Sequence, residues 1–557
     1  MITGGLLRWA PRLTLALLIL PVAAGLLGTL IPAFANDANG FHALLDWPGL
    51  RPAALLSLTT GVSATAMSLA ITLVLVASLW GTRFFGLIQH VLAPLLSVPH
   101  AAAALGLAFL IAPSGWIVRL LSPWATGWEQ PPDLLILNDP YGLSLTLGLV
   151  TKEVPFLFLM ALAALPQTDG ARRMNVAQSL GAGRIAAFVI SVLPSLYRQL
   201  RLPVYAVLAY SMTAVEMAMI LGPTRPNTLS AQVVIWMADP TLRFQATAAA
   251  GAVLQLGLVV LALAGWRGLE RLARRGMVSL ARAGLRAHAL DAIARSLAIG
   301  AGTVTAGALG LGLAGLATWS VAGLWSFPAA LPDTLTLTTW ARAAPDLART
   351  GALTLGIAVT ATTLSLALVL ACLEAEHRYA LSPDARSLWV LYLPLLVPQV
   401  AFLPGLQFAA LRSGIEGHWL AVAAAHLVFV LPYVFLSLAP SWRAWDTRLS
   451  VAGLSLGATP ARVFWRLRLP VLLRPVLTAA AVGMAVSVGQ YLPTLLIGGG
   501  RVETVTTEAV ALSSGGNRRL IGTYALLQML LPAAGFALAL LVPAWLFRNR
   551  RGMAVTA

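Results

Sequence analysis

Long apolar stretches recur along this chain, and they constrain its fold more than any other feature of the sequence. Each stretch is near the roughly 20 residues that cross about 30 Å of hydrocarbon as a helix. Helix is the expected conformation because the core of a bilayer offers unpaired backbone groups no other partner. Twelve spans are expected, at residues 13–34, 56–79, 87–112, 143–165, 203–222, 246–265, 296–320, 350–372, 388–411, 419–438, 476–497 and 523–547. The expected fold class is therefore all-α, a polytopic membrane protein with about 12 transmembrane helices.

The composition supports a chain that is surrounded by lipid. Only 10% of the 557 residues are charged and 59% are hydrophobic, whereas soluble globular proteins carry about 25% charged residues. The net charge of +17 would favour nucleic-acid binding only if basic residues were clustered on a soluble domain. The sequence shows no such domain, so we expect the lipid bilayer, and no nucleic acid, as a partner.

The distribution of arginine predicts the orientation in the membrane. Cytoplasmic loops of membrane proteins carry an excess of Lys and Arg. When both termini are placed inside, the inside segments hold 26 arginines and the outside segments hold 10. We therefore expect a multi-pass protein of the bacterial inner (plasma) membrane with both termini cytoplasmic. Ala33-Phe34-Ala35 looks like a signal-peptidase site, but the preceding apolar run exceeds the roughly 7–15 residues of a signal-peptide core, so we expect an uncleaved first span.

The chain also repeats itself. Residues 175–194 read NVAQSLGAGRIAAFVISVLP, and residues 451–470, at an offset of 276, read VAGLSLGATPARVFWRLRLP. Two residues that this offset relates are here called equivalent. A second echo relates LLSVPHAAAALGL (95–107) to LLVPQVAFLPGL (395–406). Self-similarity of this kind indicates related structural units, and we expect two parallel, tandem repeats of six helices each.

The repeats define the expected domain organisation. The expected units are a first repeat at 1–265 with a large inside loop at 167–202, a cytoplasmic linker at 266–295, and a second repeat at 296–557 with a large inside loop at 439–475. The linker is Arg-rich. It is expected to be either an interfacial helix whose basic face lies near anionic lipid heads or a solvated connection.

The two large inside loops carry a short apolar pattern that a mobile polar loop would lack. Val176 and Leu180 are four residues apart, as are Ala452 and Leu456, and this spacing places apolar side chains on one face of a short helix. A glycine follows each pattern and allows a sharp break in the chain. A Leu-Pro pair then begins the next segment, since Pro suits the first turn of a helix. A short apolar-faced helix exposed to the cytoplasm needs a partner with a groove.

The spacing within these loops resembles the EAA loop of the permease subunits of bacterial binding-protein-dependent ATP-binding-cassette importers, which have the methionine-importer-like fold. The family pattern is Glu-Ala-Ala, three residues, Gly, nine residues, Ile, one residue and Leu-Pro. The two loops give Asn175-Val176-Ala177, Gly181, Ser191 and Leu193-Pro194, and Val451-Ala452-Gly453, Gly457, Leu467 and Leu469-Pro470. Gly and Leu-Pro fit in both loops, whereas the leading Glu is missing from both and the Ile is replaced in both.

In this family the loop forms a coupling helix that docks in a groove of the ATPase subunit. The resemblance therefore implies two copies of a cytoplasmic ATPase subunit and a periplasmic solute-binding protein as partners. The residues expected to serve ATPase coupling are Val176, Ala177, Leu180, Gly181, Pro194, Ala452, Leu456, Gly457 and Pro470.

Two further segments sharpen the resemblance. Residues 137–159 and 496–512 look like the fused, two-domain permeases of the YnjC type, a branch related to thiamine and ferric-iron importer permeases. The implied function is to form the path by which a solute crosses the inner membrane, coupled to separate ATPase subunits. Thiamine-like compounds, ferric iron, oxyanions and polyamines are all open as the solute.

The chain shows no chemistry of its own. A Walker A loop needs Gly-Lys-Ser/Thr, but the only lysine, Lys152, stands between Thr151 and Glu153. We therefore expect neither enzyme activity nor catalytic residues nor a cofactor in this chain, with ATP and magnesium on the partner subunit. The seven histidines lack the close spacing of a zinc site, and the single cysteine, Cys372, lies in an apolar run, so no metal site is expected.

Three ionisable residues lie within the expected spans. They are Lys152, Glu153 and Glu216, and charged groups at such positions are costly and often functional. The span that matches the one with Glu216 contains Gln490-Tyr491. We expect these five residues to line the translocation path. The alternative is a buried structural pair, such as Lys152 with Glu216.

An ion-coupled secondary transporter is the alternative function, because its halves can also be parallel six-helix repeats. Such a transporter would not need matched apolar coupling loops. It would usually show more acidic residues within the membrane, or discontinuous helices. A membrane enzyme or scaffold is disfavoured because no catalytic constellation is recognisable.

Overall fold

The fold is helical throughout, as expected. The computed structural model describes residues 4–34, 39–95, 97–239, 243–284, 286–381 and 385–549. Within these ranges, ten helices are long and apolar enough to cross a membrane, or up to twelve if two sharply bent pairs each count as one span. The prediction of an all-α polytopic membrane protein is therefore confirmed.

The helices follow one another along the chain. Up to residue 282 they are α1 (Gly4–Leu7), α2 (Ala10–Phe34), α3 (Asn39–Asp46), α4 (Leu50–Leu79), α5 (Arg83–Leu95), α6 (His100–Ile111), α7 (Trp116–Leu121), α8 (Leu143–Ala164), the 3-10 turn η1 (Leu165–Thr168), α9 (Gly170–Ser179), α10 (Arg184–Ala187), the π-helical turn η2 (Phe188–Val192), α11 (Leu193–Ser211), α12 (Val215–Leu221), α13 (Leu229–Ala238) and α14 (Arg243–Arg282).

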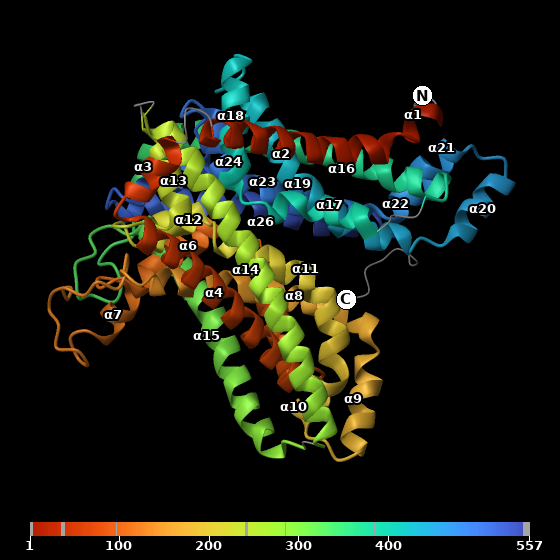
Figure 1. Ribbon diagram of the computed structural model, residues 1–557, viewed down its shortest axis with the longest axis horizontal. Coiled ribbons are helices and arrows are strands. Elements are labelled where there is room, and N and C mark those ends of the chain that lie inside the picture. The colour runs from red at the N-terminus through yellow and green to blue at the C-terminus, as the bar shows by residue number, and fades with distance from the viewer. Residues whose placement is uncertain are drawn as a thin grey trace.

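The remaining helices complete the bundle shown in Figure 1. They are α15 (His288–Val321), α16 (Thr338–Arg378), α17 (Ala385–Leu396), α18 (Gln399–Arg412), α19 (Trp419–Arg443), α20 (Thr447–Ser455), α21 (Pro460–Val463), the π-helical turn η3 (Phe464–Arg468), α22 (Leu469–Val471), α23 (Leu473–Val488), α24 (Leu492–Gly498), α25 (Val505–Leu512) and α26 (Arg518–Leu546).

Two of the expected continuous spans are broken at a proline. The span expected at 87–112 is divided into α5 and α6 beside Pro99, and the span expected at 388–411 is divided into α17 and α18 beside Pro398. The second pair bends by 87°. The expectation of a continuous helix was wrong in both places, because Pro cannot donate a helical hydrogen bond and disfavours helix in the residue before it.

Two further spans are interrupted, and only the second has a proline beside its break, Pro493 in the first turn of α24. The span expected at 203–222 ends as α11 at Ser211 and resumes as α12 at Val215. The span expected at 476–497 ends as α23 at Val488 and resumes as α24 at Leu492. The secondary-transporter alternative predicted discontinuous helices, and the structure contains them, so the choice between the two functions rests on other evidence.

The first helix of each expected repeat packs against the other repeat. Helix α2 packs along α18, and α15 packs along α6. At the first crossing, a Cβ atom on Gly28 would lie 2.8 Å from the Cα atom of Gly405, and at the second a Cβ atom on Gly312 would lie 2.8 Å from the carbonyl carbon of Gly106. Small residues let membrane helices approach closely. Gly106 and Gly405 are the two glycines that the upstream sequence echo aligns.

The expected linker is not a separate interfacial helix. Residues 266–282 continue α14 without interruption, and residues 288–295 form the first turns of α15. Figure 1 shows the end of α14 and the start of α15 meeting near α10 at the bottom of the view. The Arg-rich segment thus extends the helices on either side of it, and its interfacial position stays a prediction.

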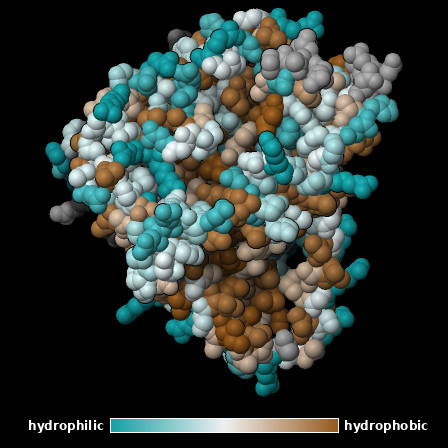
Figure 2. All heavy atoms as spheres, turned by 90° about the vertical axis from the view of Figure 1, so that its left-hand side faces the viewer, coloured by the Kyte–Doolittle hydropathy of each residue, from teal (hydrophilic) through white to brown (hydrophobic). Residues whose placement is uncertain are grey.

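Apolar side chains cover much of the exterior. Exposed residues include Leu261 on α14, Val304 on α15 and Leu541 on α26. In Figure 2, hydrophobic residues gather over the lower centre of the face, while hydrophilic residues predominate above and to its left. Large contiguous apolar patches are uncommon on soluble proteins, so this surface fits one that is covered by lipid.

Candidate coupling surfaces and translocation path

The two short helices predicted from the inside loops are both present, as α9 and α20. Each ends with the same three backbone hydrogen bonds at equivalent positions: Leu180 N to Val176 O, Gly181 N to Gln178 O and Ala182 N to Ala177 O, and Leu456 N to Ala452 O, Gly457 N to Leu454 O and Ala458 N to Gly453 O. These bonds form a Schellman motif, in which the residue after the helix adopts a left-handed conformation. Gly181 has φ +88° and Gly457 has φ +82°, so glycine is required at both turns.

The apolar residues at these turns point into open space. Leu180 is 77% exposed and Leu456 is 88% exposed, and Val176 is exposed as well. Ala452 is exposed, whereas Ala177 is half-buried. Figure 1 shows α9 at the lower right and α20 at the far right, each at the edge of the molecule. Exposure of a leucine side chain to water is unfavourable. Both turns are therefore surfaces suited to burial against a partner protein.

A helical turn already precedes each Leu-Pro pair. Pro194 lies in the first turn of α11 and Pro470 in the first turn of α22, as expected. However, a π-helical turn precedes each pair, with the amide of Leu193 bonded to Phe188 O and the amide of Leu469 bonded to Phe464 O. The wider turn accommodates the proline ring, which would otherwise clash with a carbonyl of the preceding turn.

The second loop is held by a buried arginine. Arg468 in η3 is 2% exposed, and its guanidinium donates to the Glu374 carboxylate of α16 at 2.7 Å. It also donates to His377 and, at 3.2 Å, to the Ser450 hydroxyl of α20. The Trp445 ring lies 5.2 Å beneath the guanidinium. This cluster ties α20 to the end of α16.

The first loop is apolar at the same positions. Val192 is the equivalent of Arg468, and Met174 is the equivalent of Ser450. Both of these apolar side chains are buried. The same junction is therefore filled by apolar packing in one loop and by a charged network in the other. Sequence reasoning missed Arg468, although an arginine that replaces an apolar residue of its repeat is a detectable signal.

The two glutamates of the spans belong to one connected group. Glu153 of α8 pairs with the His100 imidazole of α6 at 3.5 Å. The His100 ring packs at a tilt of 49° against Tyr210 of α11, with centroids 4.6 Å apart, and the Tyr210 hydroxyl donates to Glu216 of α12 at 2.8 Å. The structure thus links the two glutamates through two residues that the sequence did not single out.

Lys152 does not pair with Glu216, which was the structural alternative considered from the sequence. Its ammonium group donates to the carbonyl oxygens of Val98, at 2.5 Å, and Leu95, at 3.3 Å. These carbonyls lie at the break between α5 and α6. The structure therefore gives Lys152 and Glu216 different partners, and Lys152 supports the interrupted backbone, which needs hydrogen bonds that the helix no longer supplies.

Gln490 and Tyr491 lie at the break between α23 and α24. The Tyr491 side chain is buried there. The buried His426 of α19 bonds Ser487 at 2.8 Å and Thr494 at 2.9 Å, and so spans the interruption. Sequence reasoning missed His426, because its partners are 61 and 68 residues away.

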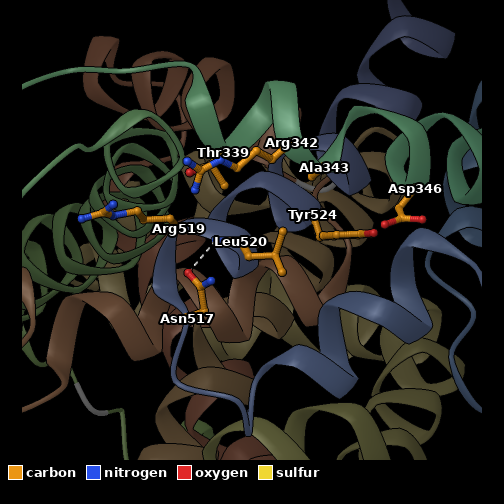
Figure 3. A pocket seen from close by; sticks show the side chains of 8 residues that line it. All are labelled: Thr339, Arg342, Ala343, Asp346, Asn517, Arg519, Leu520 and Tyr524. Atoms are coloured by element: carbon orange, nitrogen blue, oxygen red, sulfur yellow. Dashed lines mark hydrogen bonds between the residues drawn. The ribbon is translucent and has the colours of Figure 1, made fainter.

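A surface cavity lies elsewhere, between the first turns of α16 and α26. Figure 3 shows Arg342 and Asp346 of α16 facing Tyr524 and Leu520 of α26 around it. Its volume is about 420 Å³. None of the residues predicted for coupling or for the path lines it. Among the described residues, no group of three or more potential metal ligands is present.

Comparison with known proteins places the chain in a family. The profile of the family described as "Binding-protein-dependent transport system inner membrane component" matches residues 378–549. The chain is 32% identical to the "Inner membrane ABC transporter permease protein YnjC" of Escherichia coli (strain K12), over 97% of this chain and 99% of that protein. It is 31% identical to the "Molybdenum transport system permease protein ModB" of Mycobacterium tuberculosis, over 26% of this chain and 58% of that protein. No solved structure shows significant similarity.

Proposed function

This chain belongs to the family of inner-membrane components of binding-protein-dependent transport systems, and from that membership we propose that α9 and α20 dock on two cytoplasmic ATPase subunits. The chain itself is the inner-membrane permease of an ATP-binding-cassette transporter. It carries no ATPase activity, so ATP hydrolysis occurs in a separate subunit. One chain with two docking helices would serve both copies of that subunit.

One observation carries this proposal. Two short helices at equivalent places in the chain end in the same Schellman motif and expose a leucine at the same position. An isolated exposed leucine is ordinary, but the same backbone turn presented twice requires a common reason. Docking of two identical subunits supplies it, because identical grooves select similar surfaces.

We further propose that the group of Glu153, His100, Tyr210 and Glu216 borders the translocation path. Four interrupted spans provide backbone ends and polar side chains within the bilayer, and irregular backbone is tolerated there only beside protein or a water-filled cavity. Closure of the ATPase subunits would draw α9 and α20 together and tilt the two halves, opening the path toward a periplasmic solute-binding protein. The arginine bias supports this orientation, with both coupling helices and both termini in the cytoplasm.

Affinity purification tests the docking. The full chain, extracted in detergent together with the ATPase subunit of its own system, should retain that subunit. Leu180→Glu and Leu456→Glu should each reduce the amount retained, because a carboxylate would be buried in an apolar groove. Leu272→Glu is the matched control, since Leu272 is also an exposed leucine and follows the expected span 246–265. Failure of the wild-type chain to retain any ATPase subunit would overturn the proposal.

A further inference from the structure

The turn after α9 is capped by residues that lie more than a hundred positions later. The two oxygens of the Asp291 carboxylate accept from the adjacent backbone amides of Arg184, at 2.8 Å, and Ile185, at 2.9 Å. Asp291 is in the first turns of α15. The first amides of a helix have no partner within it, so Asp291 does for α10 what an N-cap side chain normally does from within the chain.

Two further contacts bind the same turn to the α14–α15 connection. The amide of Gly183 donates to the carbonyl oxygen of Arg286 at 2.6 Å, and the His288 imidazole lies 3.1 Å from the carbonyl oxygen of Gly181. A Cβ atom on Gly183 would lie 2.6 Å from Arg286 O. Glycine is therefore needed at 183 because another backbone approaches it.

The second loop has no such support among the residues that the structure describes. Thr459 is the equivalent of Gly183, and its own hydroxyl accepts from the amide of Arg462 at 3.3 Å. A Cβ atom on Gly457 would find nothing within 4 Å, whereas one on Gly181 would lie 3.5 Å from the Arg286 guanidinium. The turn after α20 is thus capped by a residue of its own loop. The turn after α9 is capped and bordered by the α14–α15 connection.

We propose that the α14–α15 connection is part of the first ATPase-docking surface, with Asp291 as its positioning residue and Arg286 as a charge beside Gly181, the residue after the docking leucine. This inference rests on the proposed docking of α9. It makes the two docking surfaces unequal: α15, which belongs to the second half, holds the coupling helix of the first half. The ATPase subunit at α9 would meet a guanidinium that the subunit at α20 does not meet, so an acidic residue at the rim of its groove fits this site.

Hydrogen–deuterium exchange of the full-length chain tests the positioning role. Asp291→Ala should speed exchange of the amides at 184 and 185 by about ten-fold, the effect of losing a helix cap, and leave the amides at 459–463 unchanged. Thr459→Ala should do the reverse. Equal exchange at 184 and 185 in Asp291→Ala and the wild type would overturn the proposal, as would equal acceleration in both loops.

Asp291→Asn keeps the readout usable if Asp291→Ala does not insert into the membrane. The amide side chain keeps the shape and one acceptor oxygen, so a smaller acceleration confined to 184–185 is expected, and wild-type exchange there would contradict the cap.

Binding of the ATPase subunit tests the surface separately. Arg286→Glu should weaken it several-fold, whereas Arg282→Glu, an exposed arginine at the end of α14, should not. Equal binding by both variants would refute the role of Arg286.

These outcomes separate the inference from the proposed function. If the wild-type chain binds no ATPase subunit, the docking proposal fails, while the exchange experiment still decides whether Asp291 caps the loop. If the wild-type chain binds the subunit and Asp291→Ala changes neither exchange nor binding, the docking stands and the inference fails.

Discussion

Removal of the Glu374 carboxylate is expected to destabilise the protein strongly, because it leaves a buried guanidinium without its counter-charge. The Arg468 side chain is 2% exposed and that of Glu374 is 8% exposed, with 2.7 Å between the charged atoms. Exposed ion pairs contribute only about 0–1 kcal/mol. Loss of one partner from a buried pair costs about 3–5 kcal/mol. We expect Glu374→Gln to fall near the lower end of that range, because the Gln carbonyl can still accept a hydrogen bond.

The assay is equilibrium unfolding of the purified chain in mixed detergent micelles. Glu503→Gln is the matched control, since the Arg349–Glu503 pair has side chains that are 67% and 40% exposed, and it should cost less than about 1 kcal/mol. The double variant Glu374→Leu with Arg468→Met should recover most of the loss, because the first loop fills this junction with apolar residues. If Glu374→Gln costs no more than Glu503→Gln, or the double variant recovers nothing, the reasoning is refuted.

Three further changes probe other parts of the structure. Glu216→Ala should lower ATPase activity stimulated by the solute-loaded binding protein while leaving membrane insertion intact; unchanged stimulation would contradict a place in the path. Gly405→Ala should cost about 1–3 kcal/mol of stability, because its Cβ atom would lie 2.0 Å from a carbonyl oxygen of α2; Gly356→Ala, which meets nothing within 4 Å, is the control, and equal unfolding free energies would contradict the crossing. Gly457→Ala should cost roughly 1 kcal/mol through its positive φ alone, and unfolding identical to the wild type would argue against the Schellman turn.

The sequence predicts those features of the fold that depend on local pattern. Hydropathy identifies the membrane helices because lipid leaves the backbone no alternative to helix. The constant offset between the two inside loops identifies α9 and α20, and their glycines and leucines lie where the spacing requires. The breaks beside Pro99 and Pro398 could also have been predicted from the sequence, because proline disfavours a continuous helix. Hydropathy alone does not show them, since the apolar run continues through each proline.

The remaining features depend on contacts between distant segments. Asp291 lies 107 residues from the amide of Arg184, and Arg468 lies 94 residues from Glu374. No local spacing joins such residues, so neither contact could be assigned from the sequence. The residues proposed to border the path could be predicted only in part. Glu153 and Glu216 stand out in the sequence because they are charged residues within apolar spans. Their connection through His100 and Tyr210 follows only from the packing of four helices.

Cross-linking from the two docking leucines tests the central claim most directly. Cys372 is the only cysteine, so a Cys372→Ala background permits a single reactive thiol at Leu180→Cys or at Leu456→Cys in the assembled transporter. We predict that each thiol cross-links to an ATPase subunit, and that Leu272→Cys on α14 does not. An intact complex in which neither Leu180→Cys nor Leu456→Cys reaches the ATPase subunit would contradict the assignment of α9 and α20 as coupling helices.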